Sequence, residues 1–133
     1  MRRWQGVADD RGSGPVDFVL VGALLTTLTL AVLQLGFAVY VRNVVHDAAV
    51  EGAHYAALAD TTLADGAERT RLSITRAVGD SFAGDISVSQ SERLGHPTAV
   101  VAVRTTLPVI GLIGIPYGLE VDADAPMESL GEQ

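Results

Sequence analysis

Three histidines and a few carboxylates are the side chains in this sequence that first suggest metal binding or acid–base chemistry. His46 and His54 are eight residues apart, about two turns of a helix, and Glu51 precedes His54 by three residues. Two ligands without a third rarely hold a metal ion. We therefore interpret Glu51 and His54 as a solvated pair on one helix face. His96 lies apart from both, next to a predicted turn.

Other arrangements that carry chemistry are missing from the sequence. Asp122 and Asp124 share one face of a predicted strand but have no plausible third ligand. The sequence has no phosphate-binding Gly-rich loop, no Gly-x-Ser-x-Gly elbow and no His-Glu-x-x-His helix. We therefore expect a protein that is not an enzyme and that binds no metal and no cofactor.

A long uncharged segment from Phe18 to Val41 holds much of the 48% hydrophobic content of this 133-residue chain. As a helix it would extend over roughly 36 Å, enough to cross a hydrocarbon core of about 30 Å. A secretory signal has a shorter apolar region and a cleavage site directly after it. A buried helix of a soluble bundle would need more surrounding chain. We therefore predict a transmembrane helix over residues 13–41, in a protein that crosses the lipid bilayer once.

The positions of the arginines predict the orientation of this helix. Arg2, Arg3 and Arg11 precede it, whereas Arg42 is followed by no other Arg or Lys until Arg69. Because basic residues stay on the cytoplasmic side, residues 1–12 are expected in the cytoplasm and residues 42–133 outside it. The outer part is acidic in a chain of net charge −7, which argues against nucleic-acid binding. With no cysteine, it has no disulfide.

Helical periodicity continues beyond the apolar segment. Apolar and small residues recur at three- and four-residue spacing from Val41 to Ala59, which predicts one helix over about residues 15–59. A second helix is expected from Thr62 or Asp65, either of which can cap it, to about Phe82.

Alternating patterns after Phe82 predict three strands, over residues 86–91, 98–107 and 119–125. A turn is expected at residues 95–97, and the third strand is expected to be exposed. A long helix, a second helix and a three-stranded antiparallel meander make an α+β fold.

The segment from Leu107 to Leu119 fits none of these elements. It is apolar but too short to span a bilayer, and Pro108 and Pro116 interrupt it. Three interpretations stay open: a buried loop, a segment at the membrane interface, and a surface that binds a partner. Loops of this hydrophobicity are usually buried, so we favour the first.

A helix-breaking stretch and then a carboxylate lead into the apolar segment. Gly12 to Pro15 break any upstream helix, and Pro15 suits the first turn of a helix that starts there. Asp17 lies at the edge of the membrane segment. A carboxylate costs less there than the roughly 2.5–3.5 kcal/mol it costs at the bilayer centre. Asp17 either has a positively charged partner or caps the helix N-terminus.

These residues resemble a known class of proteins. The stretch from Arg11 to Phe18, with the apolar segment behind it, resembles the N-terminus of type IV pilins and pseudopilins. Val44 to Leu58 (VVHDAAVEGAHYAAL) resembles a segment of TadE-like proteins of the tight-adherence (Flp) pilus system. The C-terminal strand followed by residues 125–128 (APME) does so too. The resemblance covers most of the chain, is strongest through residue 59, and implies a pilin-like fold.

The resemblance also implies processing. A prepilin peptidase would cleave the leader, residues 1–12, after Gly12, so that Ser13 becomes the mature N-terminus. Asp17 would then pair with the α-amine of Ser13, in the same chain or on a neighbouring subunit. In pilins the corresponding acid is normally Glu, so Asp17 departs from the pattern by one methylene.

As a TadE-like (TadE/TadG) minor pilin or pseudopilin in the cytoplasmic membrane, the protein would support assembly of a Flp/Tad pilus or secretion apparatus. Small residues in the span would let other helices approach closely; they are Ala23, Ala31, Gly36 and Ala38. The implied partners are the prepilin peptidase, other TadE/TadG-type subunits, the major Flp pilin and the inner-membrane assembly platform. The alternative is an unprocessed single-pass membrane protein whose outer domain binds a ligand or an envelope partner.

Overall fold

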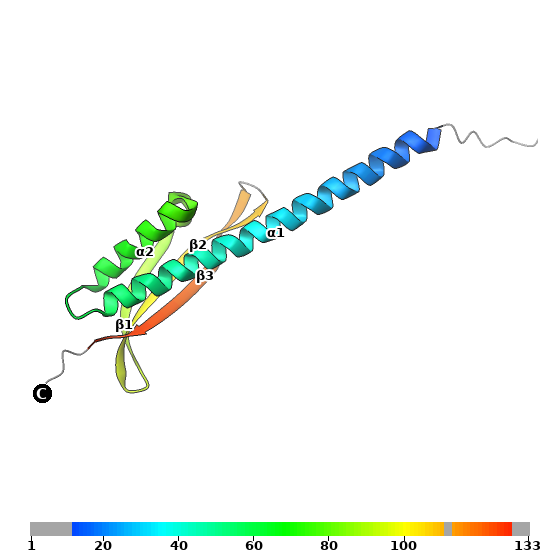
Figure 1. The fold of residues 1–133 in the computed structure, drawn as a ribbon. Helices are drawn as coiled ribbons and strands as arrows, with labels where there is room; N and C mark the ends of the chain where they lie inside the picture. Colours follow the sequence, from blue (N-terminus) through cyan, green and yellow to red (C-terminus); the bar gives the residue numbers. More distant parts are fainter. Residues whose placement is uncertain (1–11, 111–112, 129–133) are drawn as a thin grey trace, which may run out of the picture. The chain divides into compact units, whose positions relative to one another are not determined.

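The structure is a computed structural model that describes residues 12–110 and 113–128. Its elements are α1 (Ser13–Ala57), α2 (Leu63–Val78), the 3-10 helix η2 (Asp80–Phe82), β1 (Asp85–Arg93), β2 (His96–Ile110) and β3 (Ile113–Pro126) (Figure 1). This order confirms the predicted α+β fold. The chain divides into two compact units, Met1–Leu33 and Gln34–Gln133, and α1 contributes to both.

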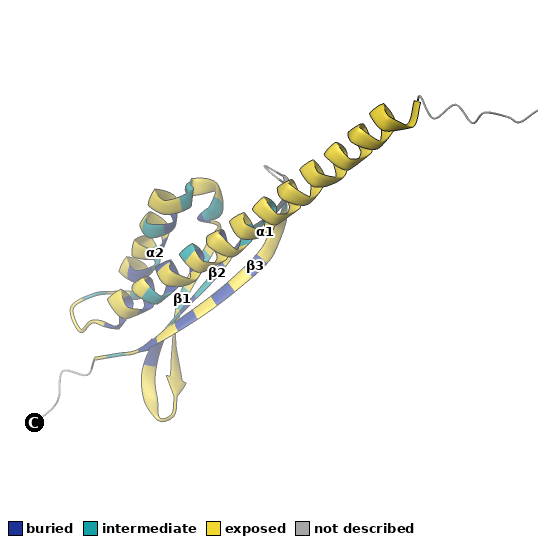
Figure 2. Cartoon of the chain, turned by 45° about the vertical axis from the view of Figure 1, so that its right-hand side comes forward, coloured by how far each residue is buried: buried dark blue, intermediate teal, exposed yellow. Residues whose placement is uncertain are grey.

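The described residues of the first unit form the N-terminal part of α1. Their side chains are mostly large and apolar, and all of them are exposed (Figure 2). The hydroxyl groups of Thr27 and Thr29 donate to the carbonyl oxygens of Ala23 and Leu25, each over 2.8 Å, so the helix itself satisfies them. Among the described residues, α1 is the only helix long and apolar enough to cross a membrane.

In the second unit α1 buries one face. The buried residues recur at three- and four-residue spacing and most are alanines: Val41, Val45, Ala48, Ala49, Gly52, Ala53, Ala56 and Ala57. Upstream of them, the Phe37 ring meets the Phe82 ring edge-on, with 6.2 Å between centroids. The amide of Gln34 donates to the Pro108 carbonyl over 3.1 Å. The second unit therefore includes the last part of the predicted membrane segment.

Helix α2 begins at the predicted cap. Thr62 and Asp65 form a capping box, in which the Thr62 hydroxyl accepts from the Asp65 amide and the Asp65 carboxylate accepts from the Thr62 amide. The predicted end at Phe82 was wrong. Gly79 has φ of 106°, a left-handed conformation that ends α2 at Val78, and Phe82 belongs to η2.

The three strands form an antiparallel sheet in the order β1-β2-β3, as the predicted meander requires. The first turn lies earlier than predicted. Leu94 and Gly95 both have positive φ, 53° and 80°, which makes a two-residue type I′ hairpin, and His96 already pairs with Arg93.

The prediction that Leu107 to Leu119 is a loop was wrong. β2 continues to Ile110 and β3 begins at Ile113, and their register pairs Leu107 with Ile115 and Pro108 with Gly114. The pairing of β1 with β2 stops at Arg104, so beyond this point β2 has a neighbour on one side only. Proline is tolerated at position 108 because β2 has no strand on its other side to which a backbone N–H would have to donate.

One core joins both helices to one face of the sheet (Figure 2). Ile74 of α2 and the buried face of α1 pack on alternate residues of the sheet: Ala99, Val101, Val103, Leu119, Val121, Ala123 and Ala125. The third strand is therefore buried on one face rather than simply exposed. Within residues 119–125, the side chains between these positions, such as Glu120 and Asp122, face solvent.

Candidate functional site

The predicted processing residues lie where α1 starts. Ser13 is the first residue of α1, and Gly12 directly precedes it. A Cβ added at Gly12 or Gly14 would meet no atom within 4 Å, so packing gives no reason for glycine at either position. Residues 1–11 of the predicted leader lie outside the described residues.

Asp17 is exposed and is the fifth residue of α1. This position is inside the helix, beyond its N-cap, so Asp17 does not cap α1. Residues four apart face the same side of a helix. The carboxylate of Asp17 and the backbone nitrogen of Ser13 are therefore on one side, as pairing within one chain requires. The pairing itself stays a prediction.

The four predicted helix-packing residues differ in exposure. Ala23 and Ala31, in the first unit, are exposed. In the second unit Gly36 is exposed, and a Cβ there would meet nothing within 4 Å, whereas Ala38 is half-buried. Gly36 and Ala38 are separated by about 160° around the helix axis. Ala38 thus faces its own domain, and Gly36 faces away from it.

Helices α1 and α2 cross at glycines. A Cβ at Gly52 would lie 1.8 Å from the Thr70 hydroxyl oxygen, and one at Gly66 would lie 2.5 Å from the Ala56 Cβ. The buried Thr70 hydroxyl donates to the Gly66 carbonyl over 2.9 Å. The two helices approach this closely only because neither glycine carries a side chain.

Polar side chains flank the same crossing. The Glu51 carboxylate accepts from the Ser73 hydroxyl at 2.6 Å and from the Arg69 guanidinium at 2.7 Å. The Ser73 hydrogen bond and then Arg69 lower the pKa of Glu51 below its ordinary value. Arg69 also lies over the Tyr55 ring, 5.8 Å from its centroid.

The expected pairing of Glu51 with His54 was wrong. Glu51 binds α2, and Nδ1 of the exposed His54 lies 2.8 Å from the Val50 carbonyl oxygen. Two acids of β3 bind arginines across the sheet: Asp124 with Arg93 at 3.2 Å and Glu120 with Arg104 at 3.3 Å. Throughout the described part of the chain, no three His, Asp or Glu side chains come together as a metal site.

The comparisons with known proteins fit the N-terminal geometry. The family model for TadE-like proteins matches residues 12–54, about a third of the chain. Residues 12–54 are thus similar to TadE-like proteins. Neither the curated proteins nor the solved structures contain a match to the chain.

The TadE-like segment runs from the predicted processing site to the α1–α2 crossing. It contains the exposed apolar part of α1 and most of its buried face. The TadE-like family is a structural, non-enzyme family associated with the Tad pilus, and the match suggests a role of this kind for the chain. Together with the long apolar helix, it suggests a single-pass membrane protein in a pilus system.

Two features of this region escaped prediction from sequence. The α1–α2 crossing joins residues more than a dozen positions apart, and no local pattern marks Gly66 as its contact. The β2–β3 hairpin is not predictable from a pattern that treats its prolines as strand breakers, although Pro108 pairs with Gly114 within it. The available signal in the sequence was that no residue from Thr105 to Leu119 is charged, which indicates that both halves of the segment belong to one structural unit.

Proposed function

We propose that the chain is a TadE-like minor pilin or pseudopilin, a non-catalytic component that supports assembly of a Flp/Tad pilus or secretion apparatus. The observation that carries this proposal is that an exposed apolar helix begins immediately behind Gly12 and continues, without a break, into the core of an outer domain.

The length of the exposed part supports membrane insertion. Residues 13–33 of α1 extend over about 31 Å, close to the roughly 30 Å of a hydrocarbon core. From Gln34 onward the same helix belongs to the outer domain. With the basic residues at the N-terminus, the leader is cytoplasmic and the outer domain extracytoplasmic.

Processing after Gly12 would convert this anchor into a pilin-like N-terminus. The new α-amine of Ser13 would be one helical turn from Asp17, and an amine–carboxylate pair offsets the cost of a carboxylate near the bilayer. Between subunits, the same pair would connect one helix to the next. The partners are the prepilin peptidase, other TadE/TadG-type subunits, the major Flp pilin and the assembly platform.

Intact-mass analysis of membrane-extracted protein tests the processing step. With the prepilin peptidase present, the main species should begin at Ser13, and Gly12→Val should keep residues 1–12. Gly14→Ala is the matched control, because both glycines are in open space. A dominant unprocessed species with the peptidase present would instead favour an unprocessed membrane protein whose outer domain binds a ligand or an envelope partner.

Cross-linking tests helix packing, and the natural absence of cysteine makes single-cysteine variants straightforward. Cysteine at Ala23, Ala31 or Gly36 should give cross-links to neighbouring helices in membranes. Cysteine at Ala38 is the control, because Ala38 is half-buried by its own domain. Equal cross-linking at Gly36 and Ala38 would contradict the assigned packing face.

A further inference from the structure

The β2–β3 hairpin carries a long uncharged segment. No residue from Thr105 to Leu119 is charged, although the outer domain is acidic as a whole. The segment is bounded on both strands by charge, because Arg104 and Glu120 are register partners and form an exposed ion pair at 3.3 Å. The described part of the hairpin beyond this pair therefore carries no charge, whereas the rest of the domain has many charged residues.

Contacts within the outer domain fix which end of the domain this hairpin occupies. The Thr105 hydroxyl donates to the Phe82 carbonyl at 2.7 Å, and the Phe82 ring meets Phe37. Farther along β2, the Pro108 carbonyl accepts from Gln34. Gln34 is the first residue of the outer domain, directly after the exposed apolar part of α1. The hairpin thus extends toward the end of the domain where the apolar helix joins it.

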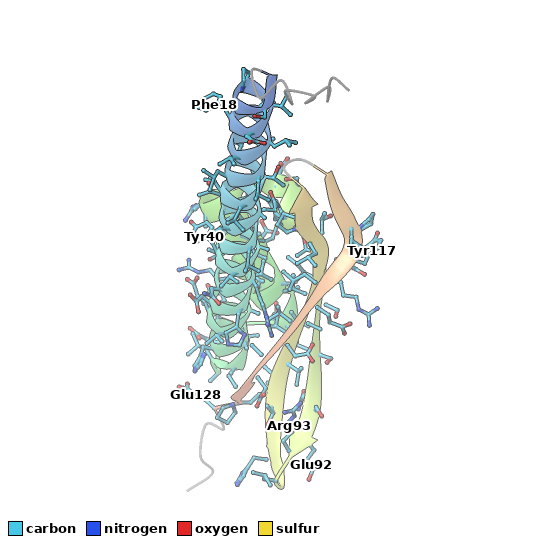
Figure 3. The ribbon with its side chains drawn as sticks, turned by 90° about the vertical axis from the view of Figure 1, so that its right-hand side faces the viewer. Phe18, Tyr40, Glu92, Arg93, Tyr117 and Glu128 are labelled. Carbon is cyan, nitrogen blue, oxygen red and sulfur yellow. The ribbon has the colours of Figure 1, made fainter. Side chains whose placement is uncertain are left out.

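The opposite end of the sheet carries charged residues. There the Glu128 amide donates to the Ala57 carbonyl over 2.9 Å, at the last residue of α1. Figure 3 shows Tyr117 at about the level of Tyr40 along α1, and Glu92 and Arg93 at the far end of the sheet. Tyr40 and Tyr117 are both exposed, and they lie at about the same height along the α1 axis.

A bulge in β3 presents the apolar side chains. Thr105 pairs with Leu119 and Leu107 pairs with Ile115, so residues 116–118 of β3 lie opposite the single Thr106, an excess of two residues on β3. Tyr117 has φ of 55°, a left-handed conformation that is rare for a bulky residue. Bulges re-aim side chains, and here Tyr117 is 70% exposed and Ile115 53% exposed.

We propose that this bulge, residues 116–118, and the neighbouring Ile115 lie in the headgroup region of the bilayer that α1 crosses. The inference rests on the proposed membrane insertion of residues 13–33. If those residues fill the hydrocarbon core, the helix residues from Gln34 to about Ala38 pass through the headgroup layer, which is roughly 5–8 Å deep on each side of the core. Ile115 is at this depth, because its register partner Leu107 precedes the Pro108 that binds Gln34, and Tyr117 is at the outer edge of the layer. A tyrosine with an apolar body and a polar tip suits that layer, as does the absence of charge.

The bulge thereby gives the outer domain a second attachment to the membrane, separate from the helix in sequence. A single helix leaves a domain able to tilt over the bilayer surface, whereas two attachments restrict its tilt. The outer face of the subunit would then be presented to incoming partners in one orientation.

Tryptophan quenching by brominated lipids tests the inference on the full chain in nanodiscs. All variants carry Trp4→Phe, which removes the natural tryptophan. Tyr117→Trp and Ile115→Trp probe the bulge, Leu24→Trp probes the centre of the span, and Glu92→Trp probes the far end of the sheet. The lipids are phosphatidylcholines brominated either near the headgroup or near the end of the acyl chain.

We expect the bulge tryptophans to lose emission mainly with bromine near the headgroup, and Leu24→Trp mainly with bromine deep in the chain. Glu92→Trp should keep its emission in both lipids. If Leu24→Trp is quenched while both bulge variants behave like Glu92→Trp, the inference is wrong and the membrane span stands. If Leu24→Trp is not quenched, membrane insertion fails and the inference fails with it.

Discussion

Gly52 of α1 and Gly66 of α2 face each other so closely that a Cβ added to either would lie 2.8 Å from the carbonyl oxygen of the other. The relationship is reciprocal, and both close contacts are to backbone. Because a carbonyl oxygen cannot rotate away as a side chain can, this distance fixes how near α2 approaches α1.

Gly52→Ala should therefore destabilise the outer domain. Overpacking a tight contact costs about 1–3 kcal/mol, and here the new methyl meets both the Gly66 carbonyl and the Thr70 hydroxyl. Thermal unfolding of the full chain in detergent, followed by circular dichroism, measures the loss. Gly36→Ala is the matched control. Its Cβ meets nothing, and replacing a helical glycine by alanine should gain up to about 1 kcal/mol. Equal midpoints for the two variants would contradict the close helix contact.

Glu51→Gln should lower stability at neutral pH by less than about 1 kcal/mol, because the Glu51–Arg69 pair is nearly half exposed and solvent screens it. The Ser73 hydrogen bond and Arg69 lower the folded-state pKa of Glu51 below its ordinary 4.5. The contribution is thus fully present above pH 4.5 and is lost as the pH falls through the lower folded-state value. Urea midpoints between pH 7 and pH 3 measure it.

In that titration, the wild type and Glu51→Gln should converge at the acid end. Thr62 lowers the pKa of Asp65 as well, but Asp65 titrates in both proteins and cancels in their difference. Glu68→Gln removes one carboxylate charge from an exposed position on α2 and is the control for the loss of a negative charge as such. A constant difference for Glu51→Gln would show that charge and hydrogen bonding at Glu51 do not hold the helices together.

Leu94→Asn should stabilise the protein by about 0.5–1 kcal/mol. Leu94 occupies the first central position of a type I′ turn with φ of 53° and is 99% exposed, whereas Asn-Gly is the preferred pair for such a turn. Urea unfolding measures the gain. Leu94→Ala removes the exposed side chain without the preference for positive φ and should change stability little. A gain equal in both variants would assign the effect to lost surface hydrophobicity instead.

A fragment of residues 34–133 should be more stable than one of residues 42–133. The shorter fragment lacks the fully buried Val41, the Phe37–Phe82 ring contact and the Gln34 hydrogen bond. Burying a valine contributes about 1.5–3 kcal/mol and an aromatic pair about 1 kcal/mol more. Urea unfolding of both fragments should therefore differ by roughly 2–4 kcal/mol. Coincident curves would mean that the domain does not use these residues.

Asp17→Asn should impair assembly while leaving processing intact. If pairing with the Ser13 amine contributes about 1–2 kcal/mol, its loss weakens subunit association roughly five- to thirtyfold. Counting surface pili in cells that carry each variant measures assembly, and intact mass measures processing. Asp17→Glu keeps the charge and restores the residue usual in pilins, so it should assemble at least as well as the wild type. Normal piliation with Asp17→Asn would argue against the pairing.

Local patterns in the sequence predicted most of the fold. The spacing of apolar and small residues from Val41 onward predicted the helix face that the core uses, since helical period and burial follow from a few neighbouring residues. Thr62 and Asp65 predicted the start of α2 in the same way, because a capping box lies within four residues.

Non-local contacts were not predictable from these patterns. Proline breaks a strand that has neighbours on both sides. At Pro108, however, β2 is paired only with β3, so the missing N–H of proline is tolerated. The nearest basic residue to Glu51 in the sequence is His54, which made it the predicted partner. The actual partners, Arg69 and Ser73, are on α2, 18 and 22 residues away. For the candidate site, the sequence placed Gly12, Ser13 and Asp17 at the helix start, but the bulge at Tyr117 depends on register between strands.

The small residues on the buried face of α1 have a consequence during biosynthesis. The ribosome synthesises this face before it synthesises residues 96–126, which form the strands that pack on it. At about 5–20 residues per second, the face therefore stays exposed for roughly 4–14 s. Five of its eight buried residues are alanines, and a bare alanine face offers little apolar surface to chaperones or to other nascent chains. The face of α1 that waits for the sheet is thus built mostly from residues that bind weakly to other apolar surfaces in the meantime.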